Sequence, residues 1–192
     1  MVPSLLYSSS PLLAAHTMVG CSTGYMTDIR GEWAPLVDRA AQTSSSAIEL
    51  SALSEDELPG LLGYLARAPR LPFHFVSVHG PSKHRAMPDA ELAEHLKRLP
   101  AWVSAIVLHP DAMAELSPYA ALGRRLVIEN MDTRKELGQT VEGLLPFFER
   151  LPEARLCLDL AHAKAVDPSM EEGAALLSAF CDTVESCPSE LA

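Results

Sequence analysis

The feature that most constrains the fold is an alternation of short apolar runs with longer amphipathic stretches along most of the chain. Six runs have the length and composition of strands: 17–25, 46–53, 73–80, 102–109, 124–130 and 154–160. The stretches between them carry apolar residues at helical spacing, and several begin with the Ser, Asp or Pro that is typical of helix starts. Runs such as VSAIVL and RRLVI are apolar on both faces, which indicates a parallel sheet covered by helices.

The length and composition favour a single globular domain. The 192 residues, 48% of them hydrophobic, can bury a sizeable core, and no low-complexity linker divides them. We expect residues 16–192 to form this domain. Residues 1–15 are apolar and Ser-rich but contain no Lys or Arg, so they are expected to be a flexible leader that lacks the charged start of a secretion signal.

The net charge, the apolar stretches and the cysteines indicate which partners and which compartment to expect. A formal net charge of −10 disfavours broad binding to nucleic acid or to an anionic membrane surface. No apolar stretch approaches the roughly 20 residues that span a bilayer. The four cysteines form no CxxC pair, which favours reduced thiols. Together these features predict a cytoplasmic protein whose partners are neither nucleic acids nor membranes.

Four of the predicted strands end at, or just before, side chains that can bind a metal. These side chains are His79, His109, Glu129, and Asp159 with His162. Ends of parallel strands meet at one edge of a sheet, and imidazole with carboxylate ligands suits a divalent cation such as Zn, Mn, Co or Mg. Each residue alone also fits an ordinary role, because a strand-end His often bonds to backbone and Asp is a common turn former. The occurrence of four such strand ends in succession favours a metal site.

The same residues favour a barrel over an open nucleotide-binding sheet. No glycine-rich GxGxxG or GxxxxGKS loop follows any predicted strand. Ligand-capable residues at successive strand ends instead favour a TIM-barrel-like parallel sheet containing about six of the eight βα units. Six strands cannot close an eight-stranded ring, so we expect an incomplete barrel with the first and sixth strands as open edges. Open edges predict self-association as a homo-oligomer, or a complementing chain.

The segments VSVHGP, IVLHP, LVIENMD and LCLDLAHA, in this order over about residues 17–185, resemble the xylose isomerase-like superfamily of TIM barrels. That superfamily includes sugar isomerases, epimerases and the endonuclease IV type of abasic-site nuclease. In the nuclease branch, the resemblance implies that His79, His109 and Glu129 hold one cation, that Glu129 and Asp159 begin a second site, and that His162 begins a third. In the isomerase branch it implies Glu129 and Asp159 as two of four ligands of one cation. The superfamily's seventh-strand His and eighth-strand Glu have no counterpart here.

Three hypotheses follow from the resemblance and the residues. The first is a divalent-metal-dependent isomerase or epimerase of a sugar or sugar phosphate, in which the catalytic residues Glu129 and Asp159 hold the cation, with activity impaired by the absence of strands 7 and 8. The second is an endonuclease IV-like phosphodiester hydrolase, against which the net charge counts. The third is a catalytically incomplete barrel that acts as a binding or assembly module.

Basic residues after the predicted strands could bind an anionic substrate. They are Lys83, Arg85, Arg134, Lys135 and Lys164. The alternative is that exposed loops simply carry Lys and Arg. We expect Glu49 to be structural, and His16, His74 and His95 to be surface or packing residues.

Overall fold

The computed structural model describes residues 18–180 and 184–186, which form a curled, open sheet of parallel strands in sequential order. The strands are β1 (Gly20–Ser22), β2 (Ala47–Ser51), β3 (Phe75–His79), β4 (Ala105–Leu108), β5 (Leu126–Glu129), β6 (Arg155–Leu158) and β7 (Val184–Ser186). Each strand pairs in parallel with the next. The predicted α/β fold, an incomplete TIM-barrel-like sheet, is confirmed.

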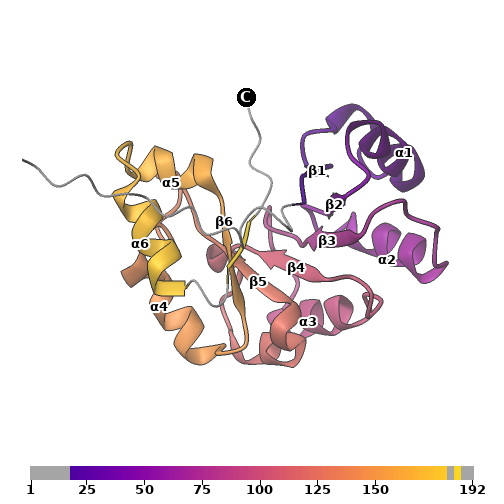
Figure 1. Cartoon of the computed structure of the whole chain (residues 1–192). Helices are drawn as coiled ribbons and strands as arrows, with labels where there is room; N and C mark the ends of the chain where they lie inside the picture. Colours follow the sequence, from indigo (N-terminus) through magenta and orange to yellow (C-terminus); the bar gives the residue numbers. More distant parts are fainter. Residues whose placement is uncertain (1–17, 181–183, 187–192) are drawn as a thin grey trace, which may run out of the picture.

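Helices cover the outer side of this sheet, with α1 and α2 beside the first strands and α4 to α6 beside the last (Figure 1). The α-helices are α1 (Trp33–Thr43), α2 (Leu58–Ala66), α3 (Asp89–Lys97), α4 (Val141–Arg150), α5 (Leu160–Val166) and α6 (Glu171–Phe180). The 3₁₀ helices are η1 (Thr27–Ile29), η2 (Pro110–Ala112) and η3 (Ser117–Arg125). None of these described helices is long and apolar enough to cross a membrane.

The connection between β4 and β5 contains only 3₁₀ turns where the sequence predicts a short helix. Pro110 and Pro118 each stand in the first turn of a 3₁₀ segment, where the missing N–H is tolerated. Gly123 has a φ of 54°, which interrupts the second segment. The chain therefore passes from β4 to β5 through 3₁₀ segments, without an α-helix.

The structure adds a short seventh strand to the six predicted ones, and because β7 pairs with β6, the prediction of the sixth strand as an open edge is wrong. The sequence pattern extends the last helix to Glu185, whereas α6 ends at Phe180 and Val184–Ser186 aligns with Leu156–Leu158. A three-residue strand containing Glu and Ser gives no period-two signal, so only pairing with a neighbour defines it. Among the described strands, β1 and β7 are the outermost. The predicted leader and His16 lie outside the described residues.

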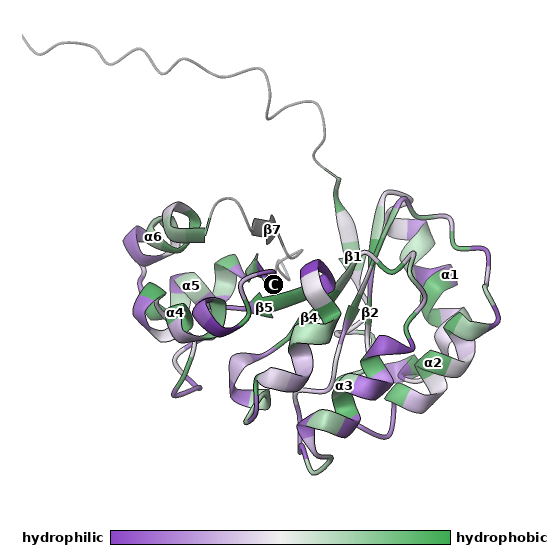
Figure 2. Cartoon of the chain, turned by 90° about the horizontal axis from the view of Figure 1, so that it is seen from below, coloured by the Kyte–Doolittle hydropathy of each residue, from purple (hydrophilic) through white to green (hydrophobic). Residues whose placement is uncertain are grey.

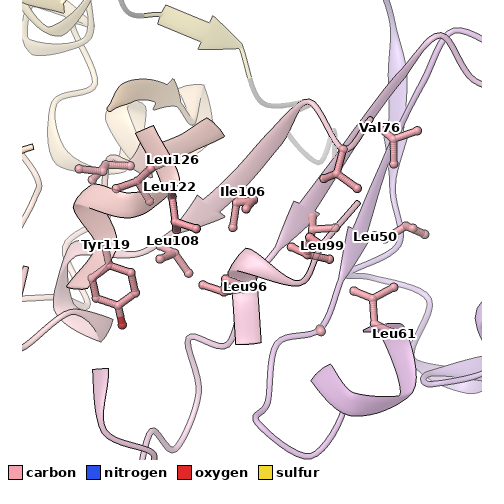
Figure 3. Close-up of a cluster of buried hydrophobic side chains, with 14 of the residues drawn as sticks. Leu50, Leu61, Val76, Leu96, Leu99, Ile106, Leu108, Tyr119, Leu122 and Leu126 are labelled. Atoms are coloured by element: carbon pink, nitrogen blue, oxygen red, sulfur yellow. The ribbon is translucent and has the colours of Figure 1, made fainter. Parts of the chain in front are cut away.

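Two apolar clusters pack against the two faces of the sheet. The large one lies between the outer face and the helices, and Figure 3 shows Leu50, Val76 and Ile106 of the strands meeting Leu61 and Leu96 of the helices. The small one, on the inner face, consists of Ala105, Val107, Val127 and Cys157, with Phe75 packed against it. Figure 2 shows the apolar strands inside helices of mixed polarity. The expectation of strands apolar on both faces therefore holds for the central strands.

The outer cluster should carry much of the stability. Leu96 on α3 is fully buried, so Leu96→Ala should lower the free energy of unfolding by about 2–5 kcal/mol through lost contacts and a residual cavity. Leu145→Ala on α4 is the matched control, because Leu145 is 45% exposed and its loss should cost under about 0.5 kcal/mol. Urea unfolding measures both, and equal losses would contradict the packing described here.

Candidate metal centre

The two-residue period of the strands places the candidate ligands on the inner face. In three successive strands a candidate ligand stands two positions after an inner-face residue. The pairs are Val107 with His109, Val127 with Glu129, and Cys157 with Asp159. The parallel register aligns the carboxyl ends of these strands at one edge of the sheet. Local strand geometry and parallel pairing together therefore bring residues far apart in sequence to one place.

His79, His109 and Glu129 converge at this edge with their ligand atoms in mutual contact. His79 Nε2 lies 3.1 Å from His109 Nε2 and 3.2 Å from Glu129 Oε2, and His109 Nε2 lies 3.3 Å from the same oxygen. Ligands at about 2.0–2.1 Å from a tetrahedral Zn²⁺ are separated by about 3.3 Å. The three atoms thus have the spacing of one triangular face of such a coordination shell, and they form a group that could hold a metal ion.

The hydrogen bonds of His79 select the ring nitrogen that faces the other two ligands. Its Nδ1 donates to the backbone carbonyl of Gly80 at 2.9 Å, which leaves Nε2 to point at Glu129 and His109. A backbone carbonyl that fixes the tautomer in this way is a common support for metal-binding histidines. His79 is therefore oriented as a ligand would be.

The contacts between His79 and Glu129 shift the pKa values of these two residues in opposite directions. Burial disfavours the charged ring of His79, but the hydrogen bond and charge of Glu129, with the charge of Glu49, outweigh it and raise the pKa of His79 from 6.5 to about 9. Burial would likewise raise the pKa of Glu129, yet hydrogen bonds from His109 and His79 hold it well below its usual range. The pKa shifts thus favour a protonated His79 beside an ionised Glu129.

A second group that could hold a metal ion shares Glu129 and adds Asp159 and His162. His162 Nδ1 lies 3.4 Å from Glu129 Oε1 and 3.7 Å from Asp159 Oδ2. The same nitrogen donates to the Asn130 carbonyl at 2.9 Å, so it carries a proton in this arrangement. This group would have to give up that hydrogen bond before His162 Nδ1 could bind a cation, and the first group is the readier site.

Asn130 links the ends of β5 and β6. Its side chain accepts from the backbone N–H of Asp159 at 2.6 Å and donates to the Asp159 carbonyl at 3.1 Å. Asp159 in turn caps α5, since its Oδ1 accepts from the backbone N–H of His162 at 2.8 Å. Glu129 and Asn130 are both buried and hydrogen-bonded, so neither is a solvated loop residue.

Arg85, a predicted substrate-binding residue, is engaged in a buried network. Its guanidinium donates to Glu55 at 2.8 Å, to Asp89 at 3.1 Å and to the backbone carbonyl of Ala112. The Tyr119 hydroxyl donates to the same Asp89 carboxylate at 2.5 Å. With two carboxylates already bound, this cation holds loops together.

The other four predicted substrate-binding cations are more accessible. Arg134 binds Asp132 through Nε at 2.6 Å, and Lys135 binds Asp111 at 2.6 Å. Lys83 and Lys164 are exposed. Lys83, Arg134 and Lys135 lie in loops that follow strands, as the sequence predicts, whereas Lys164 lies in α5. The geometry leaves these four cations as candidates for an anionic ligand.

Sequence reasoning missed two acidic residues beside the candidate ligands. Asp111 Oδ1 lies 3.8 Å from His109 Nδ1, and Asp132 Oδ2 lies 3.8 Å from His162 Nε2. Their positions within HPD and ENMD, two or three residues after a ligand, were the available signal. The expected structural role of Glu49 agrees with the hydrogen bond it accepts from Ser22 at 2.7 Å.

We compared the chain with protein-family models, with curated proteins and with solved structures, and none of the three comparisons gave a match.

The pKa of His79 sets a pH dependence for the metal-free protein. A histidine whose pKa rises from 6.5 to about 9 on folding contributes stability below pH 6.5, and that contribution is lost as the pH passes 9. We expect the free energy of unfolding, measured in chelator, to fall by up to about 3 kcal/mol between pH 6.5 and 9. His79→Gln should flatten this fall, whereas exposed His74→Gln should retain it. Equal slopes in both variants would contradict the cluster.

Arg85 and Lys83 offer a direct comparison of structural and accessible cations. Arg85→Ala removes the guanidinium from Glu55 and Asp89, which keep hydrogen bonds from backbone N–H groups and from Tyr119, and should lower the free energy of unfolding by about 1–3 kcal/mol. Lys83→Ala should change it by less than about 0.5 kcal/mol. Urea unfolding distinguishes them, and a neutral Arg85→Ala would show that the network is not structural.

Proposed function

We propose that the chain is a divalent-metal-dependent enzyme of the xylose isomerase-like kind, with its cation held by His79, His109 and Glu129. The observation that carries this proposal is the 3.1–3.3 Å triangle formed by the three ligand atoms. Two imidazoles with one carboxylate are a ligand set typical of catalytic Zn²⁺, and they leave a coordination position for water or substrate. The cation would supply positive charge for polarising an oxygen or lowering the pKa of bound water.

Within that class, the ligand set favours hydrolysis of a phosphate ester. The two candidate groups contain three histidines and two carboxylates, and nitrogen-rich sets suit the borderline cations that activate water at neutral pH. Glu129 belongs to both groups, as a carboxylate bridging two cations would. A net charge of −10 argues for a small phosphorylated substrate over duplex DNA, whose binding needs a broad basic surface.

The second candidate is an isomerase or epimerase of a sugar or sugar phosphate. Its support is the second group, in which Glu129 and Asp159 both approach His162 Nδ1. Two carboxylates on one cation could polarise a carbonyl or hydroxyl while a neighbouring group moves a proton. The hydrogen bonds of the Asn130 side chain also support a role of Asp159 as a ligand, because they fix the backbone of Asp159 relative to β5.

The open sheet supports a proposal about partners. Among the described strands, β1 and β7 each pair with a single neighbour. Unpaired strand edges favour pairing with another chain. A second copy or a complementing chain could cover these edges and supply further ligands to the cation. A catalytically incomplete module that binds metal could also associate with another chain through these edges.

The function is tested on the whole chain, stripped with chelator and reloaded separately with Zn, Mn, Co or Mg. We expect hydrolysis of p-nitrophenyl phosphate or its diester, with kcat/KM at least about 100-fold lower in His109→Ala and Glu129→Gln. Exposed His74→Ala is the matched control and should match the wild type. Deuterium exchange on a panel of sugars and sugar phosphates, without hydrolysis, would favour the isomerase. Tight metal binding without either reaction would favour the binding module, and absence of metal binding would contradict all metal-dependent readings.

A further inference from the structure

His109 is the one candidate histidine whose Nδ1 makes no hydrogen bond within the part of the chain that the structure describes. Its Nδ1 is the single buried side-chain nitrogen or oxygen without a hydrogen-bond partner among the residues that the structure describes. The corresponding nitrogens of His79 and His162 donate to the backbone carbonyls of Gly80 and Asn130. A buried polar atom left unpaired costs about 1–3 kcal/mol, so this one requires a physical explanation.

The nearest charged group is the carboxylate of Asp111, two residues further along the chain. Asp111 Oδ1 lies 3.8 Å from His109 Nδ1, beyond hydrogen-bond range. The other oxygen, Oδ2, accepts from Lys135 Nζ at 2.6 Å. The side chain of Asp111 is 25% exposed, and a rotation that brings Oδ1 closer to Nδ1 would form the missing hydrogen bond. The carboxylate therefore lies between the ammonium group of Lys135 and an imidazole nitrogen that has no hydrogen-bond partner.

We propose that Asp111 is a positioning residue for the metal centre: its carboxylate accepts the Nδ1 proton of His109 and aims Nε2 at the cation. This inference rests on the proposed function, because it concerns the same cation. A carboxylate behind a metal-binding histidine fixes its tautomer and makes it a more basic ligand. Lys135 keeps the carboxylate close without occupying both oxygens. The position of Lys135 is thus explained without assigning it to a substrate.

Cobalt binding tests this role, because Co²⁺ reports its ligands by visible absorption without any need for turnover. Asp111→Ala should weaken Co²⁺ and Zn²⁺ binding by 10- to 100-fold, the usual effect of losing such a support. It should also alter the Co²⁺ absorption spectrum. Asp111→Glu retains a carboxylate and should recover at least part of the affinity. Asp38→Ala, at an exposed aspartate on α1, is the matched control and should bind like the wild type.

Lys135→Met separates the hydrogen bond from the ion pair. It removes the Lys135–Asp111 contact but leaves the carboxylate, so the affinity should stay within about threefold of the wild type. A loss as large as that of Asp111→Ala would show that the ion pair shapes the loop, and would overturn the positioning role. Wild-type affinity in Asp111→Ala would overturn this inference alone. A wild-type chain that binds no metal would overturn the proposed function, and this inference with it.

Discussion

The candidate site depends on a carboxylate that is kept negative while almost wholly shielded from water. Glu129 is 5% exposed and lies within 3.4 Å of nitrogens from three histidines. Removing a carboxylate from water is costly unless positive charge or hydrogen bonds replace the lost hydration. Protons on the surrounding rings, or a cation among them, can provide that replacement. The three histidines around Glu129 at the inner edge of the sheet meet this requirement.

The sequence could predict those residues whose position depends on backbone geometry alone. A two-residue period and parallel pairing suffice to send His109, Glu129 and Asp159 to one face, so the strand-end pattern could identify them. His79 required no more than the same reasoning on a fourth strand. The large outer core is likewise encoded in residue type, because helix and strand periods place the apolar side chains.

Features that depend on contacts between loops could not be predicted in this way. Arg85 stands after a strand like the other candidate cations, and only the approach of Glu55 and Asp89 makes it structural. Asp111 becomes relevant only through the position of its carboxylate, 3.8 Å from Nδ1 of His109. The strand Val184–Ser186 has no pattern of its own and is defined by pairing. In each case the deciding partner lies in a different segment of the chain.

The resemblance to the xylose isomerase-like superfamily and the side-chain geometry are independent arguments that point to the same residues. The resemblance proposes ligands from motif order, whereas the geometry proposes them from distances between atoms. Neither argument selects a substrate. The ratio of imidazole to carboxylate ligands and the net charge of −10 are the physical grounds for proposing a small phosphate ester.

The network around Arg85 has a consequence for the movement of the loops that it joins. It joins the segment after β2, through Glu55, to the segments after β3 and β4, through Asp89 and Ala112. Three neighbouring loops at the rim are thereby fastened into one wall. Movement of one of these loops would therefore require the hydrogen bonds of Arg85 to break or the other two loops to move with it.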